Sequence, residues 1–308
     1  MELPPESHPA ETRRAELALL GVIIAWGMNF AVVKGALTEF LPLSFNATRF
    51  AIASVALWLI ASLRGIDLRV PRSLLLKIAI IGVMQTTLYQ ILFIEGIART
   101  TAGNSAMILS TTPAIVSLLS WLLGREKLNR WTATGVVLAF SGLYFVISAG
   151  GKTISLSSTT LTGDLLTLLA TLLWSLYTIF AQPFFTKVEP LKFTTLATLL
   201  GSIPLLVWCT PALLAQNWHA ISPAGWSGML FSGLIAIAIS FIIWNYSIAK
   251  VGPTRTAIYS NLIPVVAVIT GVLFLHERLR PLQIFGAVLV LSGILLTRIA
   301  ARQPKSEK

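Results

Sequence analysis

The chain has 308 residues, of which 55% are hydrophobic and only 11% are charged, and its mean hydropathy is +0.80. A soluble domain carries about a quarter charged residues because its surface faces water, so this composition excludes a soluble globular protein. The net charge of +11 comes from Lys and Arg spread over short loops between apolar runs, which argues against a nucleic-acid-binding face.

The predicted elements begin with a polar, Pro-rich tail at residues 1–15, which we expect to be cytoplasmic. The apolar run that follows has no small-residue cleavage site, so it is typical of a retained membrane helix rather than a signal peptide. Ten runs approach the roughly 20 apolar residues that a bilayer-crossing helix needs. They lie at 16–36, 44–63, 73–95, 101–123, 131–149, 162–182, 192–214, 224–249, 254–275 and 281–299.

The connections between these runs are short and leave no room for an extramembrane domain. The sequence therefore predicts an all-α integral membrane protein with ten transmembrane helices in the lipid bilayer. If the N-terminus is inside, the inner segments hold 17 Lys and Arg residues and the outer segments hold five, with Arg49 inside the second span left out. Cytoplasmic loops carry an excess of these residues, so we expect both termini to be cytoplasmic.

The second half of the chain repeats features of the first half at a distance of 151 residues (277 − 126 = 151). Pro113 then aligns with Pro264, and Glu126 aligns with Glu277. Each half holds five predicted spans, and an odd number makes the second half enter the membrane from the opposite side. Inverted repeats of this kind are typical of transporters whose substrate site lies near the membrane midplane.

We therefore predict two inverted five-helix repeats with short flanking segments. The predicted parts are the N-terminal tail at 1–15, a first repeat at 16–149, an external linker at 150–161, a second repeat at 162–299 and a cytoplasmic tail at 300–308. Four aligned glycines, Gly135, Gly142, Gly286 and Gly293, leave open whether they pack helices inside one chain or between copies. We expect a monomer or a weak homo-oligomer.

Several motifs give the chain a family likeness. They are AWGMNF at 25–30, the Pro42–Arg49–Phe50 pattern, TTPAIVSLLSWLLGREKL at 111–128 and NLIPVVAVITGVLFLHERL at 261–279. With these motifs the chain resembles the drug/metabolite transporter superfamily, specifically its EamA-type ten-helix exporters, and is similar to bacterial exporters of aromatic amino acids and other metabolites. The resemblance implies a multi-pass transporter of small molecules that works by alternating access.

Uncharged polar and aromatic side chains recur inside the predicted spans. Polar groups at membrane depth are costly and usually face a cavity, and several of these residues are three or four apart, on one face of a helix. The predicted substrate-binding residues are Trp26, Asn29, Gln85, Tyr89, Trp174, Tyr177, Trp244 and Asn245. The alternative for the Trp and Tyr residues is an anchoring role at the membrane surface.

Two prolines and two glutamates mark equivalent points of the repeats. Pro113 and Pro264 lie deep in their spans and each removes a helical hydrogen bond, so they predict a helix break or hinge, with a packing kink as the alternative. Glu126 and Glu277 stand where apolar runs end, beside basic residues. We interpret them as structural turns on opposite membrane faces, not as a reaction centre.

The remaining charges suggest no coupling ion. Arg49 is interpreted as a snorkelling or loop-pairing cation, with gating as the alternative, and Glu95 as an interfacial partner of Arg99. Asp67 and Asp164 are the only aspartates and stand alone. A coupled carrier usually places an acid at membrane depth, so uncoupled facilitated diffusion is the simplest mechanism.

Other functions remain as alternatives. The lone Cys209 and the scattered His8, His219 and His276 predict no metal site and no cofactor. Proton-coupled efflux of drugs or amphiphiles is the second transporter reading, and the missing intramembrane acid argues against it. A membrane-embedded lipid or prenyl transferase is less favoured, because that chemistry needs clustered Asp or His residues. We therefore expect no enzymatic activity.

Overall fold

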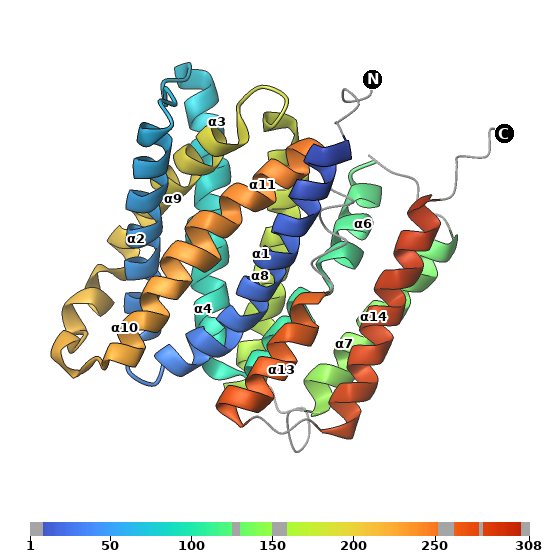
Figure 1. Cartoon of the computed structure of the whole chain (residues 1–308). Helices are drawn as coiled ribbons and strands as arrows, with labels where there is room; N and C mark the ends of the chain where they lie inside the picture. Colours follow the sequence, from blue (N-terminus) through green and yellow to red (C-terminus); the bar gives the residue numbers. More distant parts are fainter. Residues whose placement is uncertain (1–8, 125–129, 150–158, 252–261, 277–279, 303–308) are drawn as a thin grey trace.

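The computed structural model describes residues 9–124, 130–149, 159–251, 262–276 and 280–302 (Figure 1). Every regular element within these ranges is a helix, as predicted. The first half contains α1 (Pro9–Ala36), α2 (Pro42–Leu63), α3 (Arg72–Gly82), the π-helical segment η1 (Val83–Leu88), α4 (Tyr89–Arg99), α5 (Ala102–Leu109), α6 (Thr112–Leu122) and α7 (Arg130–Ala149).

The second half has a matching series of helices. It contains α8 (Thr159–Ala181), η2 (Gln182–Phe184), α9 (Pro190–Ala215), η3 (Trp218–Ala220), α10 (Pro223–Leu230), the π-helical segment η4 (Phe231–Ile239), α11 (Ser240–Val251), α13 (Ile263–Leu275) and α14 (Pro281–Arg302). Nine of the ten predicted spans thus correspond to one helix or to consecutive helices, and the described part of the ninth span, 254–275, forms α13.

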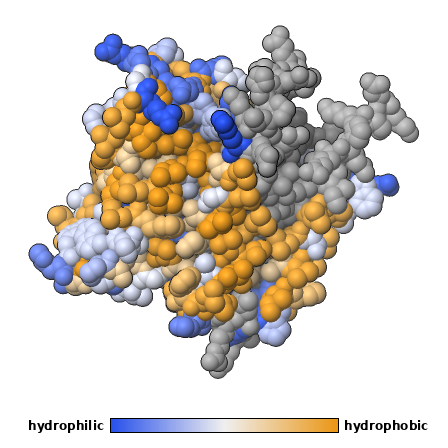
Figure 2. Space-filling model, in the orientation of Figure 1, coloured by the Kyte–Doolittle hydropathy of each residue, from blue (hydrophilic) through white to orange (hydrophobic). Residues whose placement is uncertain are grey.

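Within the described residues, six helices are long and apolar enough to cross a membrane: Leu17–Ala36, Pro42–Leu63, Arg72–Arg99, Thr159–Phe184, Pro190–Ala215 and Pro223–Lys250. Shorter apolar stretches lie in α7, α13 and α14. Hydrophobic side chains cover much of the face in Figure 2, and Leu63 is 88% exposed, Leu214 83% and Trp208 65%. Such a surface is stable only against lipid, so the chain is an all-α, multi-pass membrane protein.

The two π-helical segments lie at related positions of the two halves. A shift of 151 residues places η1 on residues 234–239, which lie inside η4. A π-helical turn inserts an extra residue into the α-helical ladder and is frequent at functional sites. The shared irregularity therefore supports the duplication and draws attention to the third and eighth predicted spans.

The four aligned glycines pack α7 against α14 inside the chain. A Cβ on Gly142 would lie 2.5 Å from the carbonyl oxygen of Gly286, and one on Gly293 would overlap the carbonyl oxygen of Gly135. Only glycine permits two helix backbones to approach so closely. The open question of their role is thus answered in favour of packing within one copy.

The two halves are intertwined, since helices of one half pack mainly on helices of the other. α2 lies against α9 and η4, α1 lies against α13 and α11, and α4 lies against α8. The start of α1 and the end of α14 lie at the same end of the bundle, and the α1–α2 and α9–α10 connections lie at the opposite end (Figure 1). Residues between the halves therefore come from both repeats.

Candidate functional site

Five of the predicted substrate-binding residues converge between the halves. The Trp26 ring of α1 lies 4.9 Å from the Trp244 ring of α11 and 6.3 Å from the Trp174 ring of α8, centre to centre. The Trp174 ring lies 5.1 Å from both Tyr89 of α4 and Tyr177 of α8. We call these five residues, together with Phe241, which contacts Trp26 and Trp174, the aromatic cluster.

The pseudo-symmetry of the chain explains why the rings meet. The 151-residue shift that relates the halves also relates Trp26 to Tyr177 and Phe93 to Trp244. Phe93 stacks on Tyr89 with a centroid distance of 5.9 Å, so it extends the cluster along α4. Equivalent helices of inverted repeats meet around a common axis, and the aromatic positions therefore come together at the interface.

The polar predicted residues are buried around these rings and are incompletely hydrogen-bonded. Asn29 Oδ1, Trp244 Nε1 and Asn245 Oδ1 have no partner among the described residues. The other amide atom of Asn245, Nδ2, donates to Thr194 Oγ1 at 2.7 Å. An unpaired buried polar group costs about 1–3 kcal/mol, so these three atoms mark places where a ligand would be stabilised.

The remaining polar contacts fix the rings in place. Trp26 Nε1 donates to the carbonyl oxygen of Ala236 in η4 at 2.7 Å, which joins α1 to the π-helical segment. Gln85 is buried in η1, one turn before Tyr89. The cluster residues pack on one another, so a solute would enter only after the helices that carry the rings move apart.

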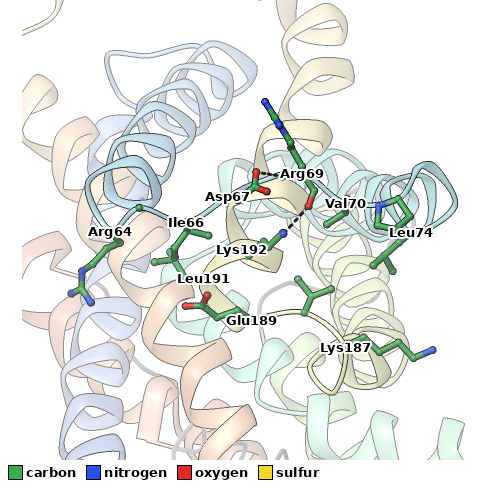
Figure 3. A pocket seen from close by; sticks show the side chains of 13 residues that line it. Arg64, Ile66, Asp67, Arg69, Val70, Leu74, Lys187, Glu189, Leu191 and Lys192 are labelled. Carbon is green, nitrogen blue, oxygen red and sulfur yellow. Dashed lines mark hydrogen bonds between the residues drawn. The ribbon is translucent and has the colours of Figure 1, made fainter.

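Figure 3 shows a pocket of roughly 720 Å³ that lies elsewhere, between the α2–α3 and α8–α9 connections. Asp67 accepts from the Arg69 amide within its own turn at 2.9 Å. Lys192 donates to the carbonyl oxygen of Arg69 at 2.7 Å and so ties the two connections together. The side chains of Arg64 and Lys187 point away from the pocket (Figure 3). Lys192 thus holds the two connections together, Arg64 and Lys187 face outward, and the pocket lies apart from the predicted site.

The fourth predicted span is divided between two helices. α5 ends at Leu109 and α6 begins at Thr112, with Pro113 in its first turn. The Thr112 hydroxyl donates to the Leu109 carbonyl oxygen at 2.6 Å and replaces the helical bond that the proline removes. Pro264 likewise stands in the first turn of α13. Whether these points act as hinges stays a prediction.

The predicted interfacial pair is present, because Glu95 and Arg99 form an ion pair one turn apart on α4. Glu126 and Glu277 lie outside the described residues.

Asp164 belongs to a buried hydrogen-bonded network that the sequence analysis did not predict. It is fully buried near the start of α8. The Thr100 hydroxyl donates to its Oδ1 at 2.6 Å, and Asn104 Nδ2 lies 3.4 Å from both carboxylate oxygens. Gln283 of α14 donates to Asn104 Oδ1 at 2.7 Å. This network joins α5, α8 and α14, and the position of Asp164 inside the predicted span 162–182 was the signal for it.

Arg49 is neither a snorkelling nor a loop-pairing cation, since its side chain is 1% exposed and bonds inside the bundle. Its Nε and Nη2 donate to Asn46 Oδ1 at 3.0 and 2.9 Å, its Nη2 to Gln90 Oε1 at 2.8 Å and its Nη1 to Ser232 Oγ at 3.1 Å. Two of these partners come from other spans. The sequence signal for burial was the absence of any acid on α2 with which Arg49 could pair near the membrane surface.

Two intertwined helical halves with polar and aromatic side chains between them are typical of membrane transporters. The chain belongs to the EamA-like transporter family, whose model matches residues 13–148 and 161–299. The members of this family are transporters and not enzymes, which excludes the transferase alternative.

Relatives of similar length support this assignment. The uncharacterized transporter YyaM of Bacillus subtilis is 27% identical over 94% of this chain and 95% of its own length. A protein of Streptantibioticus cattleyicolor named "Probable terminal-alkyne amino-acid exporter" is 26% identical over 92% of this chain and 93% of its own length. A solved crystal structure matches with a TM-score of 0.65 and 17% identity over 96% of this chain and 99% of that one, which shows a shared fold.

Proposed function

We propose that this protein exports amino acids or similar small metabolites across the bacterial inner membrane, with both termini in the cytoplasm. The observation that carries the proposal is the aromatic cluster between the halves, with the unpartnered atoms of Asn29, Trp244 and Asn245 around it. Rings bury the apolar part of a solute, and amide oxygens accept hydrogen bonds from an ammonium group.

Two further observations support the substrate class and the mechanism. The Streptantibioticus relative carries an amino-acid exporter name. The aromatic cluster contains no acid, and the buried Asp164 is bonded to Thr100 and Asn104 instead. Movement down a concentration gradient, without a coupling proton, therefore suits the site best.

Alternating access requires the rings to separate towards one side of the membrane at a time. The ladder of backbone bonds is interrupted between α5 and α6, before Pro113, and it is irregular in the π-helical η1 and η4. We propose that the helices bend at these points, because fewer intact helical bonds oppose motion there.

The test is counterflow in proteoliposomes with a panel of amino acids, with and without an imposed pH gradient. We expect exchange of large apolar amino acids that does not depend on the gradient. Singly replacing Trp26, Gln85, Tyr89 or Trp174 by Ala should raise the half-saturating concentration about tenfold or more, while the matched lipid-facing Trp208→Ala leaves it unchanged. If the wild-type protein exchanges no amino acid, the proposal is wrong.

A further inference from the structure

Arg49 places a full positive charge inside the membrane-spanning part of the bundle. It lies about two turns from Pro42, where α2 begins, and it is one of the largest fully buried side chains. A charged group at this depth is costly, and such residues mark substrate or ion pathways by default. The groups around Arg49 therefore indicate whether its charge has a structural role or binds a ligand.

The hydrogen-bond partners of Arg49 are all neutral. Asn46, Gln90 and Ser232 accept from the guanidinium, but none of these side chains carries a negative charge. The rings of Phe45, Phe50 and Phe93 lie 5.4, 5.6 and 5.7 Å from its central carbon. Rings and amides stabilise a cation only partly, because the net charge remains uncompensated.

No counter-ion reaches Arg49 from the neighbouring helices in the described residues. The helices with the most extensive packing on α2 in the described part of the chain are α4, α9, α10 and η4. Among these and α2 itself, the sequence places one acid, Glu95 on α4, and that acid pairs with Arg99. Structural buried ion pairs normally carry their own partner, since removing one partner is strongly destabilising. The missing negative charge must therefore come from elsewhere.

Two N–H donors at and beside the guanidinium are available to bind an anion. Arginine has five N–H donors, and the four bonds described above leave one N–H of Nη1 without a partner among the described residues. In the same part of the chain, the amide nitrogen of Asn46, whose oxygen accepts from Arg49, has no partner although the side chain is fully buried. An anion with two oxygen atoms would accept from both donors, as carboxylates do from a guanidinium fork.

Arg49 is adjacent to the aromatic cluster. Phe93 contacts the guanidinium and stacks on Tyr89, whose ring lies 5.1 Å from Trp174. Gln90, which accepts from Arg49, follows Tyr89 on α4. A solute with a carboxylate and an apolar side chain would therefore reach the cation and the rings together.

We propose that Arg49 and Asn46 bind the carboxylate of the transported solute, so the substrate class is small carboxylates with an apolar side chain. This inference rests on the proposed function and adds to it the group that is recognised. It predicts that solutes without a carboxylate are discriminated against, although they would fill the same aromatic space.

The experiment compares phenylalanine with phenylalaninamide and phenethylamine as competitors of amino-acid counterflow in proteoliposomes. For the wild type, we expect phenylalanine to compete at a concentration at least tenfold below that of the other two. Arg49→Gln should abolish this preference, and Arg49→Lys, which keeps the charge but not the fork, should retain part of it. Arg64→Gln is the matched control, since it removes an exposed cation at the end of the same helix.

If Arg49 were purely structural, Arg49→Gln would weaken competition by all three compounds alike and would leave the preference for phenylalanine unchanged. If folded Arg49→Gln protein keeps the tenfold preference, the inference is wrong and the proposed function stands. If Arg49→Gln does not fold, a second measurement tests the inference. It compares how much phenylalanine and phenylalaninamide raise the Tm of the wild type and of Asn46→Ala. Equal stabilisation of the wild type by phenylalanine and phenylalaninamide overturns the inference, whereas stabilisation by phenylalanine that Asn46→Ala weakens supports it. A wild type that exchanges no amino acid of any class refutes the proposed function instead.

Discussion

Trp174→Ala removes the ring at the centre of the aromatic cluster. Trp174 contacts Trp26, Tyr89, Tyr177 and Phe241, with ring centres 5.1–6.3 Å apart. Each aromatic pair contributes about 0.5–1.5 kcal/mol beyond burial, and truncating a buried Trp to Ala costs about 3–5 kcal/mol because a cavity remains. Trp174 is partly buried, so the loss should lie at the lower end of that range, at about 3 kcal/mol. We expect the free energy of unfolding to fall by about that amount.

The measurement is thermal unfolding of the purified protein in detergent. At roughly 2 °C for each kcal/mol in a large chain, Trp174→Ala should lower Tm by about 6 °C, and Trp174→Phe should lower it by less because it keeps one ring. Trp208→Ala is the matched control, since that side chain is 65% exposed and its loss should change stability by about 0.5 kcal/mol or less. Equal shifts for Trp174→Ala and Trp208→Ala would refute the packing described for the cluster.

Two further predictions concern stability. Glu39 accepts from the Ser222 amide at 2.6 Å and from its hydroxyl at 2.8 Å, and these donors lower the pKa of Glu39 below its ordinary 4.5. A lowered folded-state pKa adds stability above the ordinary value that is lost as pH falls through the lowered one. The Tm difference between wild type and Glu39→Gln should thus be constant at about pH 5–7 and shrink below about pH 4.5. A difference that persists at low pH would contradict this. Ser222→Ala removes the hydroxyl but keeps the amide donor, so it should reduce the difference only in part. Gly142→Ala forces a Cβ against the backbone of α14 and should lower the free energy of unfolding by about 1–3 kcal/mol. Gly21→Ala is the control and should be tolerated, because a Cβ there meets nothing within 4 Å. Similar Tm values for the two variants would show that α7 and α14 are farther apart.

Part of the candidate site was predictable because spacing on one helix predicts which side chains share a face. Trp26 and Asn29, and likewise Trp174 and Tyr177, are three residues apart and do lie at the interface between the halves. The 151-residue shift identified the helices that are equivalent. Neither pattern could predict which residues of the two halves contact each other, because these contacts depend on how helices distant in sequence pack.

Arg49 and Asp164 show where local reasoning fails. Arg49 meets Gln90, 41 residues away, and Ser232, 183 residues away. Asp164 meets Thr100, 64 residues away. A charge near the end of a predicted span can reach the membrane surface or turn inward, and only the neighbouring helices decide which.

The sequence by itself determined the membrane class, the span positions and the duplication. Lipid leaves no alternative partner for backbone groups, so long apolar runs must form helices there, and length and composition suffice to find them. The tertiary structure decided which polar and charged side chains lie between the helices. That choice depends on close packing across the two halves, such as the glycine contacts of α7 with α14, and it brings a lone cation beside a cluster of rings.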